Sequence, residues 1–302
     1  MPVVTVPSDE LRISTADGWT LSVLHMQAAD PVGVAVLGHA MMVDRRSMDR
    51  PRGGGLASTL AANGWHVLLA DVRGHGASGP IPEEGGNWGY DDVVFFDLPA
   101  LVAEARRLHP GLPVALLGHS LVGHMSMAAA GSGAYRETPP PDLHVLIAVN
   151  TWAWGLDPAR DLLRARDMAL FLLLTKVFGR FPSRLVRMGP ASEARTYVGD
   201  LGRFLFSGVW GSADARHDYL RNLRHVRGPI LSLAGAADAL MAHPEAVRTW
   251  NAHLTGAEVD FRVLGAGDYG LTKAPGHMEI VTDAGSRGVW EEIARWMTAQ
   301  AS

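Results

Sequence analysis

The chain has 302 residues, of which 47% are hydrophobic and 19% are charged, and its formal net charge at pH 7 is −4. This length and apolar content fit one large domain with a full core and an insertion better than two equal domains. The weak negative charge provides no basic surface to hold phosphate backbones, so we expect no nucleic-acid partner.

Cysteine is absent from the chain, which excludes disulfides, thiol nucleophiles and thiolate metal ligands. Residues 1–10 have neither a basic segment nor a sustained apolar segment, so we expect no secretory signal peptide. The longest apolar stretch, residues 168–174, is too short to span a bilayer. These features predict a cytoplasmic protein without a membrane span.

The first predicted element is a β-hairpin, because residues 11–25 alternate between apolar and polar side chains around a turn at 16–18. Short, nearly continuous apolar runs then recur along the chain, as is typical of strands that are covered on both faces. Helix-like segments separate most of these runs. The predicted strands are residues 32–37, 65–70, 114–117, 145–149, 230–234 and 259–264, and the predicted helices are residues 56–63, 92–108, 121–130, 244–254 and 286–299.

This alternation predicts an α/β protein with a mainly parallel, doubly wound sheet. Ligands of such sheets bind beyond the carboxyl ends of the strands. The alternation stops between residues 151 and 227, which are rich in aromatic side chains and contain no clear strand. We interpret residues 151–227 as a mostly helical cap inserted over the site, with residues 1–150 and 228–302 forming the core.

Ser120 follows a predicted strand and precedes a predicted helix, with a glycine two residues before it. A serine hydroxyl is a weak nucleophile at neutral pH, so it needs a tight turn, a nearby base and backbone N–H groups for the developing oxyanion. Asp238 follows the predicted strand at 230–234, and His277 lies near the end of the chain. We predict that Ser120, Asp238 and His277 form a catalytic triad, in the chain order that α/β-hydrolases use.

These features resemble the α/β-hydrolase superfamily, and within it the bacterial hydrolases related to monoglyceride lipases and prolyl-aminopeptidase-like proteins. The resemblance covers most of the chain outside the predicted cap. It rests on the serine turn, on the segment 71–78 after a strand, on the acid loop at 235–238 and on the Gly276-His277 dipeptide. It implies an α/β-hydrolase fold and a serine hydrolase that requires no cofactor.

Two segments depart from the usual family pattern. Glycine usually stands two residues after the nucleophile, where a side chain would crowd the strand–helix junction, but this chain has Val122 there and Gly123 next. The oxyanion loop reads Gly-His-Ala-Met-Met instead of the usual His-Gly-aromatic order. We predict that the backbone N–H of Leu121 holds the oxyanion together with that of Ala40 or Met41, and both of these remain open.

Other interpretations exist for the triad positions. Ser120 could act only as a helix N-cap, and Asp238 could only cap the helix that begins near residue 243. Asp214, Asp218 and Asp268 are weaker alternatives for the triad acid.

Four other histidines, His39, His75, His119 and His124, flank turns or the serine. A metal site would require three or four of them to converge, preferably with a carboxylate. We expect them instead to form hydrogen bonds within their loops or to pack beside the serine turn, and we expect no metal.

The predicted reaction is cleavage of a carboxylic ester or a related acyl bond through an acyl-enzyme. The aromatic content of the cap favours a small, largely apolar acyl substrate. The alternatives are an acyltransferase with the same triad and a non-catalytic ligand-binding member of the fold. The residues predicted to line the substrate pocket are Trp152, Trp154, Phe171 and Trp210.

Overall fold

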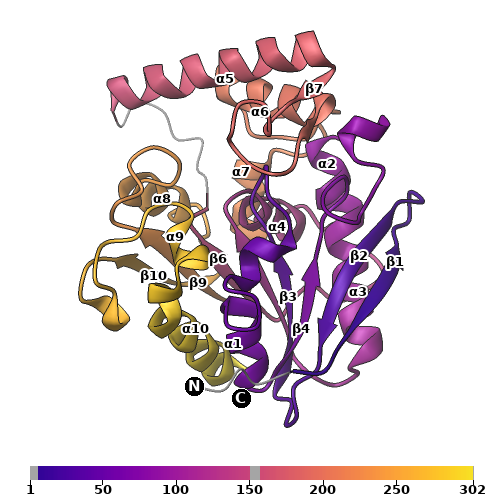
Figure 1. Cartoon of the computed structure of the whole chain (residues 1–302), viewed down its shortest axis with the longest axis vertical. Coiled ribbons are helices and arrows are strands. Elements are labelled where there is room, and N and C mark those ends of the chain that lie inside the picture. Colours follow the sequence, from indigo (N-terminus) through magenta and orange to yellow (C-terminus); the bar gives the residue numbers. More distant parts are fainter. Residues whose placement is uncertain (1–5, 150–156, 302) are drawn as a thin grey trace.

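The computed structural model describes residues 6–149 and 157–301, and its centre is an eight-stranded sheet (Figure 1). The strand order is β1-β2-β4-β3-β5-β6-β9-β10. The first two neighbouring pairs, β1 with β2 and β2 with β4, are antiparallel, and all the other pairs are parallel. The strands are β1 (Ser8–Ser14), β2 (Thr20–Met26), β3 (Gly33–Gly38), β4 (Trp65–Ala70), β5 (Val114–His119), β6 (Leu143–Ile147), β9 (Pro229–Gly235) and β10 (Glu258–Leu264).

The predicted mainly parallel sheet is confirmed, as is the opening hairpin of β1 and β2. The predicted strand at 145–149 lies two residues earlier, at Leu143–Ile147, because Ala148 has a positive φ of 46° that ends the extended backbone. The predicted helix at 92–108 contains a π-helical turn over Val93–Asp97.

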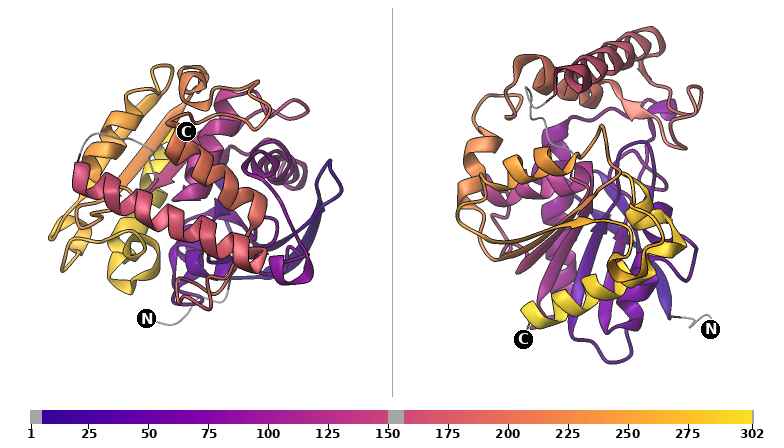
Figure 2. Two further views of the ribbon diagram at one scale, coloured as in Figure 1. Left: turned by 90° about the horizontal axis from the view of Figure 1, so that it is seen from above. Right: turned by 90° about the vertical axis from the view of Figure 1, so that its left-hand side faces the viewer.

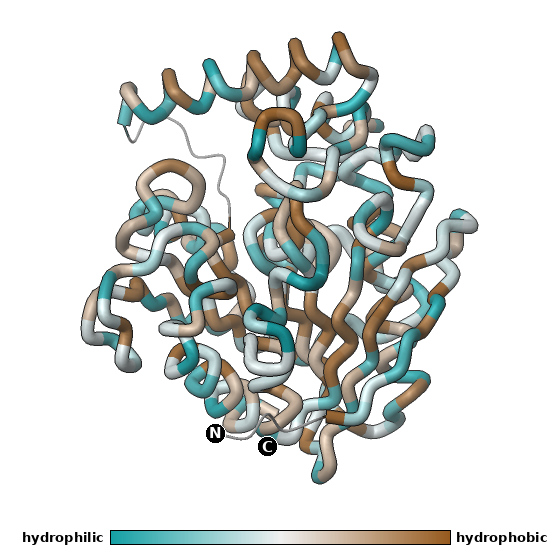
Figure 3. The backbone as a smooth tube through the Cα atoms, in the orientation of Figure 1, coloured by the Kyte–Doolittle hydropathy of each residue, from teal (hydrophilic) through white to brown (hydrophobic). Residues whose placement is uncertain are grey.

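Helices cover both faces of the sheet, and successive strand residues alternate between the two resulting cores. In β5, Val114 and Leu116 belong to the core beneath α3 (Leu98–Leu108) and α4 (Leu121–Gly131), whereas Ala115 and Leu117 belong to the core beneath α1 (Leu56–Ala62) and α10 (Arg287–Gln300). This double burial explains why the strands are nearly continuous apolar runs (Figure 3). The helices outside the predicted cap are α1 (Leu56–Ala62), α2 (Tyr90–Asp92), α3 (Leu98–Leu108), α4 (Leu121–Gly131), α8 (Pro244–Asn251), α9 (Glu279–Thr282) and α10 (Arg287–Gln300).

The segment between β6 and β9 contains α5 (Pro158–Phe178), which lies across one end of the molecule above α6 (Arg195–Ser207) (Figures 1 and 2). Asp157 accepts hydrogen bonds from two backbone N–H groups at the start of α5, and Gly179 ends the helix in the left-handed region. The segment also contains α7 (Tyr219–Asn222) and a short antiparallel pair, β7 (Arg180–Phe181) with β8 (Glu193–Ala194), where the sequence predicts no clear strand. The boundaries of the cap at 151 and 227 stay a prediction.

Among the helices that the structure describes, α5 is the longest, with 21 residues. Within residues 6–149 and 157–301, no helix combines the length and the apolar character that crossing a membrane requires.

Candidate active site

Ser120 occupies the single residue between β5 and α4 and is 2% exposed. Its φ of 53° and ψ of −113° are strained for a residue with a side chain. The Ser120 N–H donates to the carbonyl of Ile147 at 2.8 Å, which ties the turn to the end of the neighbouring strand β6. Such a turn directs the hydroxyl away from the sheet, and the first turn of α4 begins directly beside it.

Two glycines allow β5 and α4 to meet closely at this turn. A Cβ atom on Gly118 would lie 2.2 Å from the backbone nitrogen of Gly123, and a Cβ on Gly123 would lie 2.7 Å from the carbonyl oxygen of Gly118. No side chain fits at either position. The close strand–helix contact that the family makes with a glycine two residues after serine is therefore made here with Gly123.

Val122 instead packs over the end of β3. A Cβ atom on Gly38 would lie only 2.2 Å from Val122 Cγ1, so the absence of a side chain at Gly38 provides the space that Val122 fills. Val122 is buried. The departure from the family pattern is thus compensated on a different strand, and the serine turn keeps its shape.

The structure brings the three predicted triad residues into one hydrogen-bonded chain. His277 Nε2 lies 2.8 Å from Ser120 Oγ, and His277 Nδ1 lies 2.6 Å from Asp238 Oδ2. Asp238 lies in the loop after β9, and its other oxygen, Oδ1, accepts from the N–H of Met241. In this arrangement Asp238 holds the proton of His277 on Nδ1, which leaves Nε2 free to accept the serine proton.

Burial raises the pKa of Asp238, but the hydrogen bond and the charge of His277 more than offset burial, so that the pKa lies below its usual value. Asp238 is therefore ionised at neutral pH. His119 Nε2 lies 2.9 Å from the backbone carbonyl of His277 and holds the segment that carries the imidazole. Burial, followed by repulsion from His277, lowers the pKa of His119 to about 3, so His119 is neutral and donates this hydrogen bond.

The three alternative acids have other partners. Asp214 accepts from Ser212 and from the N–H of Arg216. Asp218 caps α7, and Asp268 accepts from a backbone N–H within its own loop. Asp238 is the carboxylate that the structure brings to His277.

The predicted oxyanion residues lie beside Ser120 in the fold. Leu121 is the first residue of α4, so its N–H belongs to the unpaired donors at the helix start. Ala40 and Met41 follow β3, which is the neighbour of β5 in the sheet. His39 Nδ1 lies 2.7 Å from the Ala40 carbonyl, and His39 Nε2 accepts from a backbone N–H. The neutral His39 ring therefore braces the loop that carries both candidate donors.

Glu193 in β8 also holds this loop, a contact that the sequence gives no signal for. The Glu193 carboxylate is fully buried and accepts from the N–H of Met42, which has a φ of 62°. The N–H of Ala191 donates to the carbonyl of Met42 at 3.0 Å. Glu193 of β8 and Ala191 just before it thus bind both polar backbone groups of Met42, the residue next to Met41.

His75 is the second partner of Glu193, at 3.2 Å from Nε2 to Oε1. Burial lowers the pKa of His75, but the charge and hydrogen bond of Glu193 outweigh it and raise the pKa above its usual value. Loss of either member would leave the polar group of the other buried without this partner, which costs stability. The pair therefore locks the segment after β4 to the region beneath α5.

The four histidines weighed for a metal each have separate partners. His39 and His75 lie side by side, with ring centroids 4.9 Å apart. His124 Nδ1 lies 3.0 Å from the hydroxyl of Tyr90, and its ring stacks on Trp210.

The predicted pocket residues that the structure describes are Phe171 and Trp210. Phe171 packs against Phe181, with ring centroids 4.3 Å apart. Trp210 is 5% exposed and stacks on His124 at 3.9 Å. These contacts are core packing, and a role of either residue in substrate binding stays a prediction. Trp152 and Trp154 lie outside the described residues.

A cavity of about 350 Å³ lies next to the oxyanion loop. Charged side chains make up about half of its lining, which includes none of the three triad residues. The cavity is thus distinct from the apolar acyl pocket that the sequence predicts. Among the residues that line it are Asp44, Arg45, Asp71, Glu83, Arg184 and Ser192.

Comparison with protein families gives one match. A family model described as "Serine aminopeptidase, S33" matches residues 42–264, which contain Ser120 and Asp238. No curated protein matches the chain by sequence.

Many solved structures share the fold. A soluble variant of monoglyceride lipase from Saccharomyces cerevisiae superposes with a TM-score of 0.71 at 15% identity, over 100% of this chain and 98% of that one. A thermostable carboxyl esterase from Bacillus coagulans gives 0.66 at 17% identity, over 99% and 100%. An esterase from Pyrococcus furiosus gives 0.65 at 16% identity, over 99% and 93%. At these identities the likeness shows the fold alone.

Proposed function

The chain belongs to the serine aminopeptidase S33 family of α/β-hydrolases, and from this premise we propose that it cleaves a carboxylic ester, or a related acyl bond, of a small and largely apolar substrate. The observation that carries the proposal is the hydrogen-bonded chain from Ser120 Oγ through His277 to Asp238, built on a strained turn. Strained backbone at a buried serine next to a base is typical of an activated nucleophile.

In the first half-reaction Ser120 Oγ attacks the carbonyl carbon while His277 Nε2 takes the hydroxyl proton. Asp238 stabilises the imidazolium that forms and keeps the ring oriented. The N–H groups of Leu121 and of Ala40 or Met41 receive the negative charge on the tetrahedral oxygen. Collapse of this intermediate expels the alcohol, which takes the proton from His277, and leaves the acyl group on Ser120.

In the second half-reaction water attacks the acyl-enzyme. His277 takes a proton from the water and returns it to Ser120 Oγ as the carboxylic acid leaves. The residues of the chain supply every proton transfer, so no cofactor takes part in this scheme.

An ester is favoured over an amide because an alkoxide leaving group needs less protonation than an amide nitrogen. The names of the monoglyceride lipase and the two esterases that share the fold point in the same direction. Aromatic residues of the cap segment favour an apolar acyl group over a charged one.

The test compares p-nitrophenyl esters with p-nitroanilides that carry the same acyl groups, from acetyl to octanoyl. We expect the esters to be cleaved at least about tenfold faster in kcat/KM. We also expect kcat/KM to rise over the first few methylenes, since each is worth up to ~0.8 kcal/mol in an apolar pocket. Highest activity on charged aminoacyl anilides would contradict the proposal. Transfer of the acyl group to an added alcohol in preference to water would show an acyltransferase instead.

A further inference from the structure

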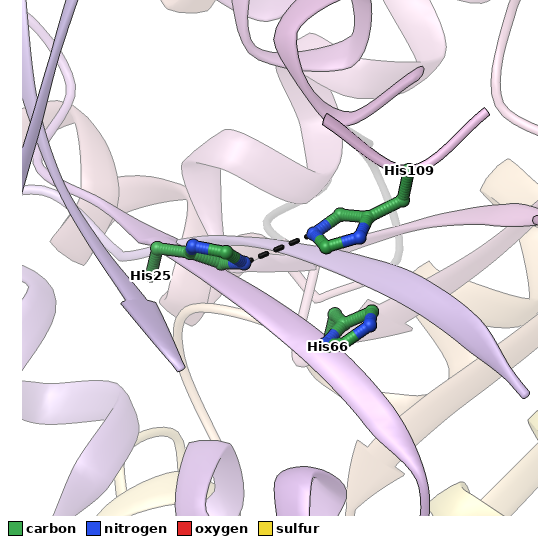
Figure 4. A group of neighbouring side chains, drawn as sticks. All are labelled: His25, His66 and His109. Carbon is green, nitrogen blue, oxygen red and sulfur yellow. Dashed lines mark hydrogen bonds between the residues drawn. The ribbon is translucent and has the colours of Figure 1, made fainter. Parts of the chain in front are cut away.

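Three histidines from separate parts of the chain meet near the amino end of the parallel strand β4 (Figure 4), whereas Ser120 follows the carboxyl end of β5. His25 lies near the end of β2, His66 is the second residue of β4, and His109 directly follows α3. In the antiparallel pairing of β2 with β4, His25 faces Leu68, so His66 is its diagonal neighbour on the same face. The end of α3 brings His109 onto that face.

We propose that His25, His66 and His109 bind a single divalent transition-metal ion, with Zn²⁺ as the best match. One ring nitrogen of each histidine lies within 4.8 Å of the others. The Nε2 atoms of His25 and His109 are hydrogen-bonded to each other at 3.0 Å (Figure 4), so a metal ion between them replaces this proton, which moves to Nδ1 of His109. Zinc–nitrogen bonds of about 2.0–2.1 Å in a tetrahedron place ligand nitrogens about 3.3 Å apart, so this pair is close to the required spacing.

A carboxylate orients the first ligand. His25 Nδ1 lies 3.2 Å from Asp9 Oδ1. A hydrogen bond of this kind keeps the proton on Nδ1 and directs the lone pair of Nε2 toward His109. Metal-binding histidines commonly donate their second ring N–H to a carboxylate in this way, which fixes the ring and raises its basicity.

His66 is the weakest of the three ligands. Its ring stacks on His109, with centroids 3.9 Å apart, and its Nδ1 accepts from the N–H of Ala28 at 3.1 Å. His66 must rotate out of this stack and release Ala28 to present a lone pair to the metal. We therefore expect His25 and His109 to dominate the affinity and His66 to complete the site.

Imidazole ligands select the metal. Three neutral nitrogens suit Zn²⁺, Ni²⁺, Co²⁺ or Cu²⁺, whereas Mg²⁺ and Ca²⁺ prefer oxygen ligands. Three histidines leave a fourth tetrahedral position for water. The sequence gives no signal for this site, because the three histidines lie on separate elements. Only the order of the strands in the sheet brings these elements together.

The experiment titrates Zn²⁺ into the metal-stripped full chain by calorimetry and repeats the titration with Co²⁺ by visible absorption. We expect one saturating equivalent, a tetrahedral Co²⁺ spectrum, a higher Tm with Zn²⁺, and no effect of Mg²⁺. Asp9→Asn should weaken Zn²⁺ binding about 10–100-fold, and His109→Gln should weaken it at least as much. His253→Gln, at an exposed histidine elsewhere, is the matched control and should bind as the unmodified chain does.

Absence of a saturable equivalent would overturn the proposal. Equal binding by the unmodified chain, Asp9→Asn and His109→Gln would also overturn it, because the ion would then lie elsewhere. Unfolding curves in EDTA show whether each variant is folded. Asp9 is half-exposed, so Asp9→Asn keeps the test decisive if His109→Gln does not fold. None of these readouts depends on hydrolase activity.

Discussion

The contact between Gly38 and Val122 predicts a strong energetic coupling between two residues 84 positions apart. Val122→Ala removes two buried methyl groups, which at ~0.8 kcal/mol each plus a cavity cost destabilises the protein by about 2–3 kcal/mol. Gly38→Ala introduces a Cβ 2.2 Å from Val122 Cγ1, and such overpacking costs about 1–3 kcal/mol.

In the double variant both Cγ atoms of residue 122 are gone, and the contact that remains from this residue is its Cβ, at 3.0 Å from the new Cβ. We therefore expect the double variant to be about 1–2 kcal/mol more stable than the sum of the two single effects predicts. Urea unfolding of the four proteins measures the free energies. Gly38→Ala combined with Val289→Ala, a buried change in α10, is the control and should be additive.

The same cycle has a catalytic readout. Val122 lies in the first turn of α4, next to Leu121 and Ser120. Gly38→Ala should lower kcat by displacing this turn, and Val122→Ala in the same chain should restore part of kcat. Additivity within about 0.5 kcal/mol in stability would refute the packing argument, since independent sites behave in that way.

Three further predictions concern the triad, the oxyanion loop and pH. In single-turnover assays His277→Ala should lower kcat about as much as Ser120→Ala, and the loss in Asp238→Asn should be about 10–100-fold smaller. Loss of activity in Asp268→Asn together with retained activity in Asp238→Asn would contradict the assigned acid. Glu193→Ala should lower kcat about 10–100-fold with a smaller change in KM, because the Met42 N–H loses its acceptor, whereas Glu193→Gln should retain more activity. Equal kinetics for both variants and the unmodified chain would exclude a role of Glu193 in holding the oxyanion loop. Burial lowers the pKa of His144 to about 4, so between pH 6.5 and 4 the unfolded chain binds a proton that the folded chain does not. The free energy of unfolding should therefore decrease by about 1.4 kcal/mol for each unit that the pH falls, and His144→Leu should remove this contribution; an unchanged pH dependence in His144→Leu would contradict the assignment.

The sequence predicts the fold well because the sheet is buried on both faces. A run such as residues 114–117 has no polar face, which distinguishes it from a surface hairpin and indicates a parallel sheet. The positions of Ser120, Asp238 and His277 at ends of strands or in nearby loops follow from the same pattern. The exact end of β6 does not, because the positive φ of Ala148 is set by contacts with the next strand.

The sequence cannot reveal contacts that depend on how distant elements pack. Gly38 looks like an ordinary loop glycine and Val122 like a defect, and only their contact explains both. Glu193 resembles a surface charge of the cap segment until the fold buries it against Met42. From the sequence, Trp210 could line a pocket or pack in the core. Its stacking on His124 shows that it packs in the core.

The most direct test of the account is labelling with a fluorophosphonate, followed by mass mapping of the modified peptide. We expect a single phosphonylated residue, Ser120, with labelling and ester turnover lost together in Ser120→Ala and unchanged in Ser207→Ala, an exposed serine of α6. Modification of a different serine, or ester turnover by Ser120→Ala close to that of the unmodified chain, would contradict the assignment of Ser120 as the nucleophile.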